Sequence, residues 1–126
     1  MDVINIKEGG YTPGIVLDKE NMIFEFTGKA CPEDAGDFYD PILTWIERYC
    51  LDPAEETPFV FKLSYFNSAS SKIILHIMQK LEQLFQMGHK VSVKWYYYED
   101  DEELYYAGED FAEILNVPFE LSPISV

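Results

Sequence analysis

The chain has 126 residues, a formal net charge of −14 and 48% hydrophobic residues. This length and composition predict one globular domain over residues 1–126 and exclude a disordered chain. The acidic excess argues against nucleic acid and anionic membranes as partners, because clustered Lys and Arg bind both. No apolar stretch approaches the length of a membrane span and no leader pattern is visible, so we expect a cytoplasmic protein. Cys31 and Cys50 lack metal-type spacing, and we expect free thiols without an assigned role.

The first part of the chain predicts a β-hairpin. Strand-like segments near residues 13–17 and 22–27 flank a polar turn at residues 18–21. Residues 3–6 form a candidate extra edge strand. Residues 28–37 are rich in Gly, Pro and Asp, and we expect a loop there.

The spacing of apolar residues predicts a first helix near residues 38–50. The residues spaced for one face of this helix are Phe38, Ile42, Trp45, Ile46 and Tyr49. Its start is open to two interpretations. Asp40 is followed by Pro41, which suits a cap and a first helical residue, or the helix begins near Asp34 or Asp37 and contains the proline in an early turn.

A buried strand is predicted near residues 59–65, after an acidic loop at residues 51–58. This strand runs into a hydroxyl-rich segment, and a second helix is expected near residues 69–87. Gly88 is placed to end that helix in a left-handed conformation. The apolar face of the second helix is expected to contain Ile74, Ile77, Met78, Leu81 and Phe85.

The last third continues the alternation of strands and helices. Apolar residues alternate near residues 91–97, acidic residues open a third helix near 101–115, and a short strand follows at 119–121. Alternating elements predict an α/β domain with a mixed, mostly parallel sheet of about five strands and three helices, mainly on one face. The expected core includes Trp45, Phe61, Leu63, Ile77, Leu81, Val93, Trp95 and Phe111.

Six short pieces occur together in an order that resembles one protein family. They are Tyr11-Thr12-Pro13, Cys31-Pro32-Glu33-Asp34, Trp45-Ile-Glu-Arg-Tyr49, Tyr65-Phe-Asn-Ser68, Trp95-Tyr-Tyr-Tyr98 and Ala107-Gly-Glu-Asp-Phe111. In this order they resemble the bacterial SiaC-type regulatory phosphoproteins over about the whole chain. The resemblance implies a single STAS-like domain with the anti-sigma-factor-antagonist (SpoIIAA-like) fold.

The resemblance also implies a function as a non-enzymatic partner switch. In that family, a Thr or Ser directly after the Asn at a strand–helix junction is phosphorylated by a dedicated kinase with a histidine-kinase-like ATPase fold. A phosphatase reverses this, and the unmodified form activates an effector, which is a diguanylate cyclase controlling biofilm formation in the characterised system. The matching acceptor is Ser68. Two positions depart from the family pattern: Ser68 replaces the usual Thr, and Asp34 replaces an Asn.

Two interpretations of the hydroxyl cluster stay open on the residues alone. A serine is a good helix cap, so Ser68, Ser70 or Ser71 could serve only the backbone. Alternatively, the same helix start favours an anion, and the resemblance selects Ser68 as phosphoacceptor. Its expected surroundings are Asn67, Ala69, Ser70, Ser71 and Lys72, and Lys72 lies about one turn on, where it could screen a phosphate.

Other residues indicate no catalytic or metal chemistry. His76 and His89 have no converging ligands, the acidic run at residues 99–103 lacks the spacing of a calcium loop, and no phosphate-binding glycine motif is present. We therefore expect no catalytic residue, metal or cofactor. The alternative to the partner switch is a STAS-like module that binds a nucleotide or lipid, which requires a deep apolar pocket.

The density of tyrosine near the third helix suggests a possible partner interface. Tyr96, Tyr98 and Tyr105 are the candidates, because exposed tyrosine is enriched at protein interfaces. Tyr97 shares the face of Val93 and Trp95, and we expect it to contribute to the core.

Overall fold

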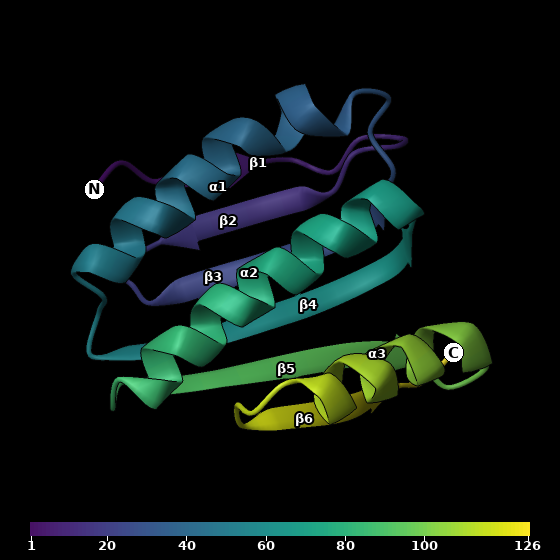
Figure 1. Ribbon diagram of the computed structural model, residues 1–126. Coiled ribbons are helices and arrows are strands. Elements are labelled where there is room, and N and C mark those ends of the chain that lie inside the picture. Colours follow the sequence, from purple (N-terminus) through teal and green to yellow (C-terminus); the bar gives the residue numbers. More distant parts are fainter.

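The computed structural model describes all 126 residues, and the elements alternate as the sequence predicts (Figure 1). Their bounds are β1 Ile4–Ile6, β2 Gly14–Asp18, β3 Ile23–Ala30, α1 Ala35–Leu51, β4 Glu56–Phe66, α2 Ser68–Gln86, β5 Lys90–Tyr98, α3 Glu102–Ile114 and β6 Phe119–Ile124.

The six strands form one sheet in the order β1-β2-β3-β4-β5-β6. The pairs β1–β2 and β2–β3 are antiparallel, and the three pairs from β3 to β6 are parallel. All three helices cover the same face of the sheet (Figure 1). The predicted mixed α/β fold is therefore confirmed, with the candidate edge strand as a sixth strand.

The core lies between the sheet and the helix layer. Alternate strand positions point into it, so Phe26, Phe61 and Trp95 form one row across three strands. Their rings pack at centroid separations of 5.4 Å and 5.8 Å along the row. All eight residues that the sequence assigns to the core are buried.

Two predicted loops are partly wrong because strand pairing extends into them. β3 continues through Ala30, and β4 begins at Glu56 rather than after Pro58. Gly28 has a positive φ of 79°, and the register with β4 shifts directly after it. A bulge of this kind lets a glycine-containing segment stay in the sheet, so local composition was overridden by tertiary pairing. β6 likewise runs on to Ile124.

The helix α1 begins earlier than the periodicity indicated. Asp34 is its cap, and the carboxylate accepts the N–H of Asp37 at 3.1 Å. Pro41 therefore lies inside the helix, as in the second of the two interpretations. Tyr39 is fully buried, whereas Phe38 is only partly buried.

The end of α2 matches the predicted glycine stop. Gly88 has a φ of 97°, and the N–H of His89 donates to the Leu84 carbonyl at 3.1 Å. This pairing of the residue after the glycine with a carbonyl of the last turn is the Schellman motif. The predicted inward position of Phe85 is wrong: Phe85 is 37% exposed, and Leu84 is buried instead.

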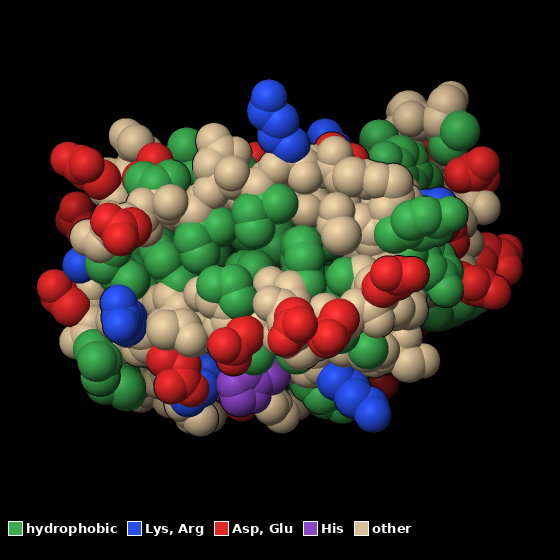
Figure 2. Space-filling model, turned by 90° about the horizontal axis from the view of Figure 1, so that it is seen from above, with side chains coloured by type: hydrophobic (Ala, Val, Ile, Leu, Met, Phe, Trp, Pro, Cys, Tyr) green, Lys and Arg blue, Asp and Glu red, His purple; other side chains and the backbone are tan.

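The edge of the sheet at β1 carries exposed apolar side chains. Figure 2, which views the molecule from above Figure 1, shows hydrophobic side chains gathered across this face, with acidic side chains below them and at both ends. Met1 and Val3 are more than half exposed, and the indole N–H of Trp45 donates to the Asp2 carbonyl at 2.6 Å. The N-terminal residues are thus held against α1, and the edge strand is only three residues long, which limits its pairing with other chains.

Candidate functional site

All three helices begin at the same edge of the sheet, where the parallel strands end (Figure 1). At the centre of this edge, a single residue, Asn67, connects β4 to α2. Its N–H donates to the Ala30 carbonyl at 3.1 Å, and its side-chain oxygen accepts the N–H of Ser70 at 2.9 Å. Asn67 is therefore the helix cap, and the interpretation in which a serine hydroxyl caps α2 is wrong.

The structure separates the three serines of the predicted cluster. Ser68 is the first residue of α2 and is exposed, as is the neighbouring Ala69. Ser70 is fully buried, and Ser71 is intermediate. Ser68 thus has the most accessible of the three hydroxyl-bearing side chains.

Ser70 is committed to a structural contact between α1 and α2. Its hydroxyl shares a buried hydrogen bond of 2.8 Å with the hydroxyl of Tyr39. Burial raises the pKa of Tyr39 above its ordinary value, and the hydrogen bond to Ser70 offsets part of that rise. A kinase cannot reach Ser70 without opening this contact.

A surface cavity of about 380 Å³ surrounds Ser68. Its lining is Phe66, Asn67, Ser68, Ser71 and Lys72. Three of the five predicted surrounding residues therefore meet at one place, and Ala69 and Ser70 do not line the cavity. Lys72 takes part in none of the four ion pairs of the molecule. Lys72 lies about one helical turn beyond Ser68, and its ammonium group has no carboxylate partner in this chain.

The charge at this edge is uneven. The first turn of α3 carries Glu102 and Glu103, and that of α1 carries Asp37, whereas the first turn of α2 has no acidic residue. A helix start favours negative charge because its first N–H groups have no partner. Ser68 thus occupies a neutral helix start between two acidic ones.

The tyrosines predicted as an interface lie on two sides of the sheet. Tyr96 is flanked by the ammonium groups of Lys62 and Lys94, 5.4 Å and 5.1 Å from its ring centroid. Tyr105 belongs to the helix layer, where its hydroxyl donates to Glu109 at 3.0 Å. Tyr98 is partly buried against the core. These residues do not form one continuous patch, and an interface role stays a prediction for each.

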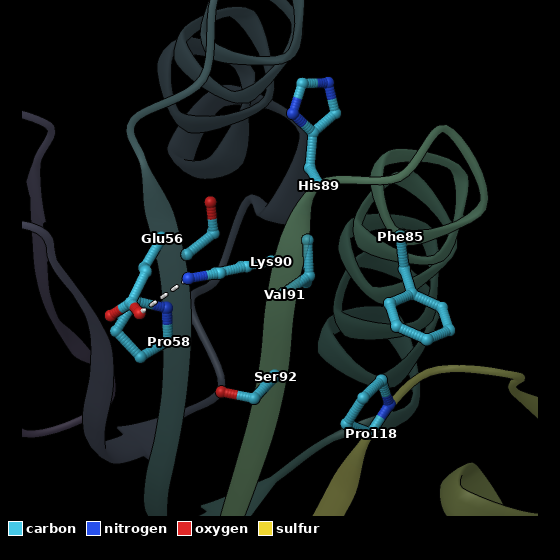
Figure 3. Close-up of a pocket in the computed structure, with 9 residues that line it drawn as sticks. Glu56, Pro58, Phe85, His89, Lys90, Val91, Ser92 and Pro118 are labelled. Atoms are coloured by element: carbon cyan, nitrogen blue, oxygen red, sulfur yellow. Dashed lines mark ion pairs between the residues drawn. The ribbon is translucent and has the colours of Figure 1, made fainter.

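A further pocket of about 400 Å³ lies at the other end of α2 (Figure 3). Its lining includes His89 and the ion pair of Glu56 with Lys90, whose charged atoms lie 4.0 Å apart. The 19 residues of α2 separate this pocket from Ser68 by about 27 Å at the usual helical rise. The charged pair in its lining differs from the deep apolar pocket that the small-ligand alternative requires.

Comparison with known families decides the relationship. The family model described as "SiaC family regulatory phosphoprotein" matches residues 6–124. The chain belongs to the SiaC family. An uncharacterized protein of Pseudomonas aeruginosa (strain UCBPP-PA14) is 29% identical over 108 residues, covering 86% of each chain.

Solved SiaC structures from Pseudomonas aeruginosa have the same fold. Apo-SiaC superimposes with a TM-score of 0.87 at 27% identity, covering 97% of this chain and 99% of that one. The complex of the diguanylate cyclase SiaD with its activator SiaC gives a TM-score of 0.90 at 26% identity, covering 96% and 99%. The resemblance based on six short pieces is thus confirmed, and this protein is a regulatory phosphoprotein of the SiaC family.

Other potential sites are limited. No group of three or more His, Cys, Asp or Glu side chains is arranged to hold a metal ion. Cys31 and Cys50 are free and partly buried, and burial raises the pKa of the Cys50 thiol. None of the helices has the length and apolar character needed to cross a bilayer.

One relevant side chain was missed by sequence reasoning. Tyr65 is 53% exposed, although the pattern places it in a buried strand. The strand alternation fails here because β4 carries one extra residue, Ser64, opposite the step from Gly28 to Lys29, which shifts the pairing just before Tyr65. No signal in the sequence of β4 itself marks this change.

Proposed function

We propose that Ser68 is the phosphoacceptor of this protein, and that its phosphorylation controls binding to an effector. The observation that carries the proposal is the separation of the serines: Ser68 is exposed at the start of α2, whereas Ser70 is buried against Tyr39. A dedicated kinase, which the family resemblance gives a histidine-kinase-like ATPase fold, adds the phosphate. A phosphatase removes it, and both act in the cytoplasm.

The effector proposed for the unmodified form is a diguanylate cyclase. The support is the close structural similarity to SiaC, the activator in the complex with SiaD. The protein itself supplies no catalysis and acts by binding. Control of cyclic-di-GMP synthesis, and thereby of biofilm formation, would be the biological outcome.

The start of α2 can hold a phosphate within the free domain. The N–H groups of Ser68 and Ala69 precede the first intrahelical bond, and the helix dipole favours negative charge there. A phosphate adds about −1.5 to −2 charges at neutral pH. Lys72, without an ion-pair partner, is available to screen it.

A partner packed over Ser68 is affected differently. An interface that buries a doubly charged phosphate without a matching cation loses several kcal/mol, on the order of the cost of an unpaired buried charge. Phosphorylation can therefore release the effector without unfolding or reshaping the regulator.

The test combines phosphate mapping with a binding titration. After incubation with the cognate kinase and ATP, phosphopeptide mapping should place the phosphate on Ser68, and Ser68→Ala should abolish it. In calorimetry against the cyclase, Ser68→Ala should bind like the wild type, and Ser68→Asp should bind at least about tenfold more weakly. The matched control is Ser92→Asp, which adds the same charge at an exposed serine beside the other end of α2 and should bind like the wild type. Phosphate on Ser71, or equal binding by Ser68→Ala and Ser68→Asp, would contradict the proposal.

A further inference from the structure

A second cavity lies beside the Ser68 cavity, between the end of β4 and the start of α3. Its volume is about 230 Å³, and its lining is Ser64, Tyr65, Phe66, Asp101, Glu103 and Leu104. Phe66 lines both cavities, so they are neighbours on the same edge of the sheet. A protein that covers Ser68 can reach this second cavity from the same side.

The walls of this cavity are aromatic and partly rigid. Phe66 packs against Trp95 and Phe111 with ring centroids 5.7 Å and 6.4 Å apart. Tyr65, in contrast, is 53% exposed and is absent from the hydrophobic core. A large aromatic side chain that is exposed three residues before a regulatory serine is typical of a contact for a protein partner.

The rim of the cavity is negatively charged. Asp101 and Glu103 line it, and neither forms an ion pair with a Lys or Arg of this chain. One oxygen of Asp101 accepts the N–H of Leu104 at 3.0 Å, which leaves its other oxygen available. The start of α3 carries about half a positive charge, which two carboxylates outweigh.

We propose that this cavity receives an arginine side chain from the protein partner that covers Ser68. A planar guanidinium can stack on the Tyr65 ring and bond a carboxylate with two N–H groups, which an ammonium cannot do. The net charge of −14 also favours a partner with a basic surface. The identity of the partner rests on the proposed function, but the chemistry of the cavity does not depend on phosphorylation.

The cavity can be tested directly with a small probe. N-acetyl-arginine amide is titrated into the full chain, and backbone amide shifts are followed by NMR. Saturable shifts are expected at Tyr65, Phe66 and Leu104. N-acetyl-citrulline amide has the same shape without the charge, and it should leave these signals unchanged. N-acetyl-lysine amide should bind at least about threefold more weakly, because an ammonium group cannot stack on the tyrosine ring and cannot bond one carboxylate with two coplanar N–H groups.

Two substitutions should weaken arginine binding while the fold is retained, as verified by circular dichroism. Glu103→Gln and Tyr65→Ala should each raise the dissociation constant at least about threefold. The matched control is Asp37→Asn, which removes one charge at the start of α1 and should have no effect. In calorimetry against the cyclase, Glu103→Gln should likewise weaken binding, and Asp37→Asn should not.

Several results would overturn the arginine site. Equal shifts with the citrulline probe would show that charge is not needed for binding. Equal affinity for the lysine probe would show that the guanidinium group is not specifically recognised. Equal effects of Glu103→Gln and Asp37→Asn would show that only the net charge of the protein matters. Ser68→Ala should bind the arginine probe like the wild type. If Ser68 proved not to be phosphorylated, the binding of the arginine probe would still be expected. If the arginine probe did not bind, the phosphopeptide mapping would still test Ser68 independently.

Discussion

The starts of α2 and α3 lie at the same edge of the sheet, but they differ in the charge that lies near their unpaired backbone N–H groups. α3 is capped by Asp101 and continues with Glu102 and Glu103, so its negative charge is permanent. α2 is capped by Asn67, and its first turn has no acidic residue. The helix that carries the accessible serine is therefore the one whose start is left neutral. A charge added there changes the surface, whereas one more charge at α3 would change little.

The two helices also differ in how they are held on the sheet. α2 contributes aliphatic side chains and one buried hydroxyl, that of Ser70. α3 comes close to the sheet through Gly108, where the indole of Trp95 takes the place of a side chain. This contact allows the Trp95 N–H to donate to the Leu104 carbonyl at 3.0 Å. The acidic start of α3 is thus fixed by close packing and the neutral start of α2 by a polar contact.

The largest expected effect comes from breaking the close approach of α3. In Gly108→Ala, the new Cβ would lie 2.6 Å from the Trp95 ring nitrogen and 2.7 Å from a Leu121 methyl. Overpacking of this kind costs about 3 kcal/mol, which outweighs the higher helix propensity of alanine. Urea unfolding should show a large loss of stability. The matched control is Gly36→Ala in α1, where the nearest atom is 3.5 Å away, and a gain of about 0.5–1 kcal/mol is expected there. A neutral Gly108→Ala would show that α3 is loosely docked.

The polar contact of α2 should be the next most sensitive feature. Tyr39→Phe leaves the buried Ser70 hydroxyl without its partner, which costs about 1–3 kcal/mol. Ser70→Ala alone leaves the Tyr39 hydroxyl unpaired, and the double variant should be less destabilised than the sum of the two. Thermal unfolding of the four proteins measures this coupling. Strict additivity would show that the two hydroxyls do not stabilise each other.

The same contact predicts a dependence on alkaline pH. The pKa of Tyr39 is raised in the folded protein, so the folded state keeps the neutral phenol over a range where the unfolded state ionises. The stability from this group is fully present below pH of about 10, and it is lost as pH rises through the higher folded value. The stability difference between wild type and Tyr39→Phe should therefore shrink above pH of about 10. A difference that stays constant there would contradict the burial of the phenol.

The fold and the site were predictable to different degrees. Alternating strands and amphipathic helices identified the sheet and the core, because Trp45 and Trp95 occupy regular positions in periodic segments. The bulge at Gly28 and the exposed side chain of Tyr65 were not predictable, since both depend on which strand pairs with which. The sequence did not distinguish Asn67 from a serine as the cap of α2, because both residue types favour the cap position.

Substituting the helix caps should separate the contribution of the cap's charge from that of its hydrogen bond, because the cap of α3 is charged and the cap of α2 is neutral. Asp101→Ala and Asn67→Ala should each lose about 1 kcal/mol in urea unfolding, because one backbone N–H loses its acceptor. Asp101→Asn keeps the acceptor and should lose less, since only the charge disappears. Asp110→Ala, at an exposed position of α3, is the control and should change stability little. Equal losses for Asp101→Ala and Asp101→Asn would assign the whole effect to charge.

The smallest expected effect is the change in stability when a negative charge is added at the start of α2. Ser68→Asp should raise stability by about 0.5 kcal/mol at low salt, because a carboxylate at this position faces the unpaired N–H groups of the first turn. Ser68→Asn has nearly the same shape without the charge and should bring no such gain. At α3, Glu102→Gln should change stability less than that, because Asp101 and Glu103 already supply the charge and repel a third carboxylate.

Urea unfolding at two salt concentrations distinguishes these outcomes, since screening by roughly 1 M salt should remove the gain of Ser68→Asp. If Ser68→Asp were less stable than Ser68→Asn at low salt, the start of α2 would reject negative charge in the free protein. Phosphorylation would then act by disturbing α2 itself rather than by changing what can dock on it.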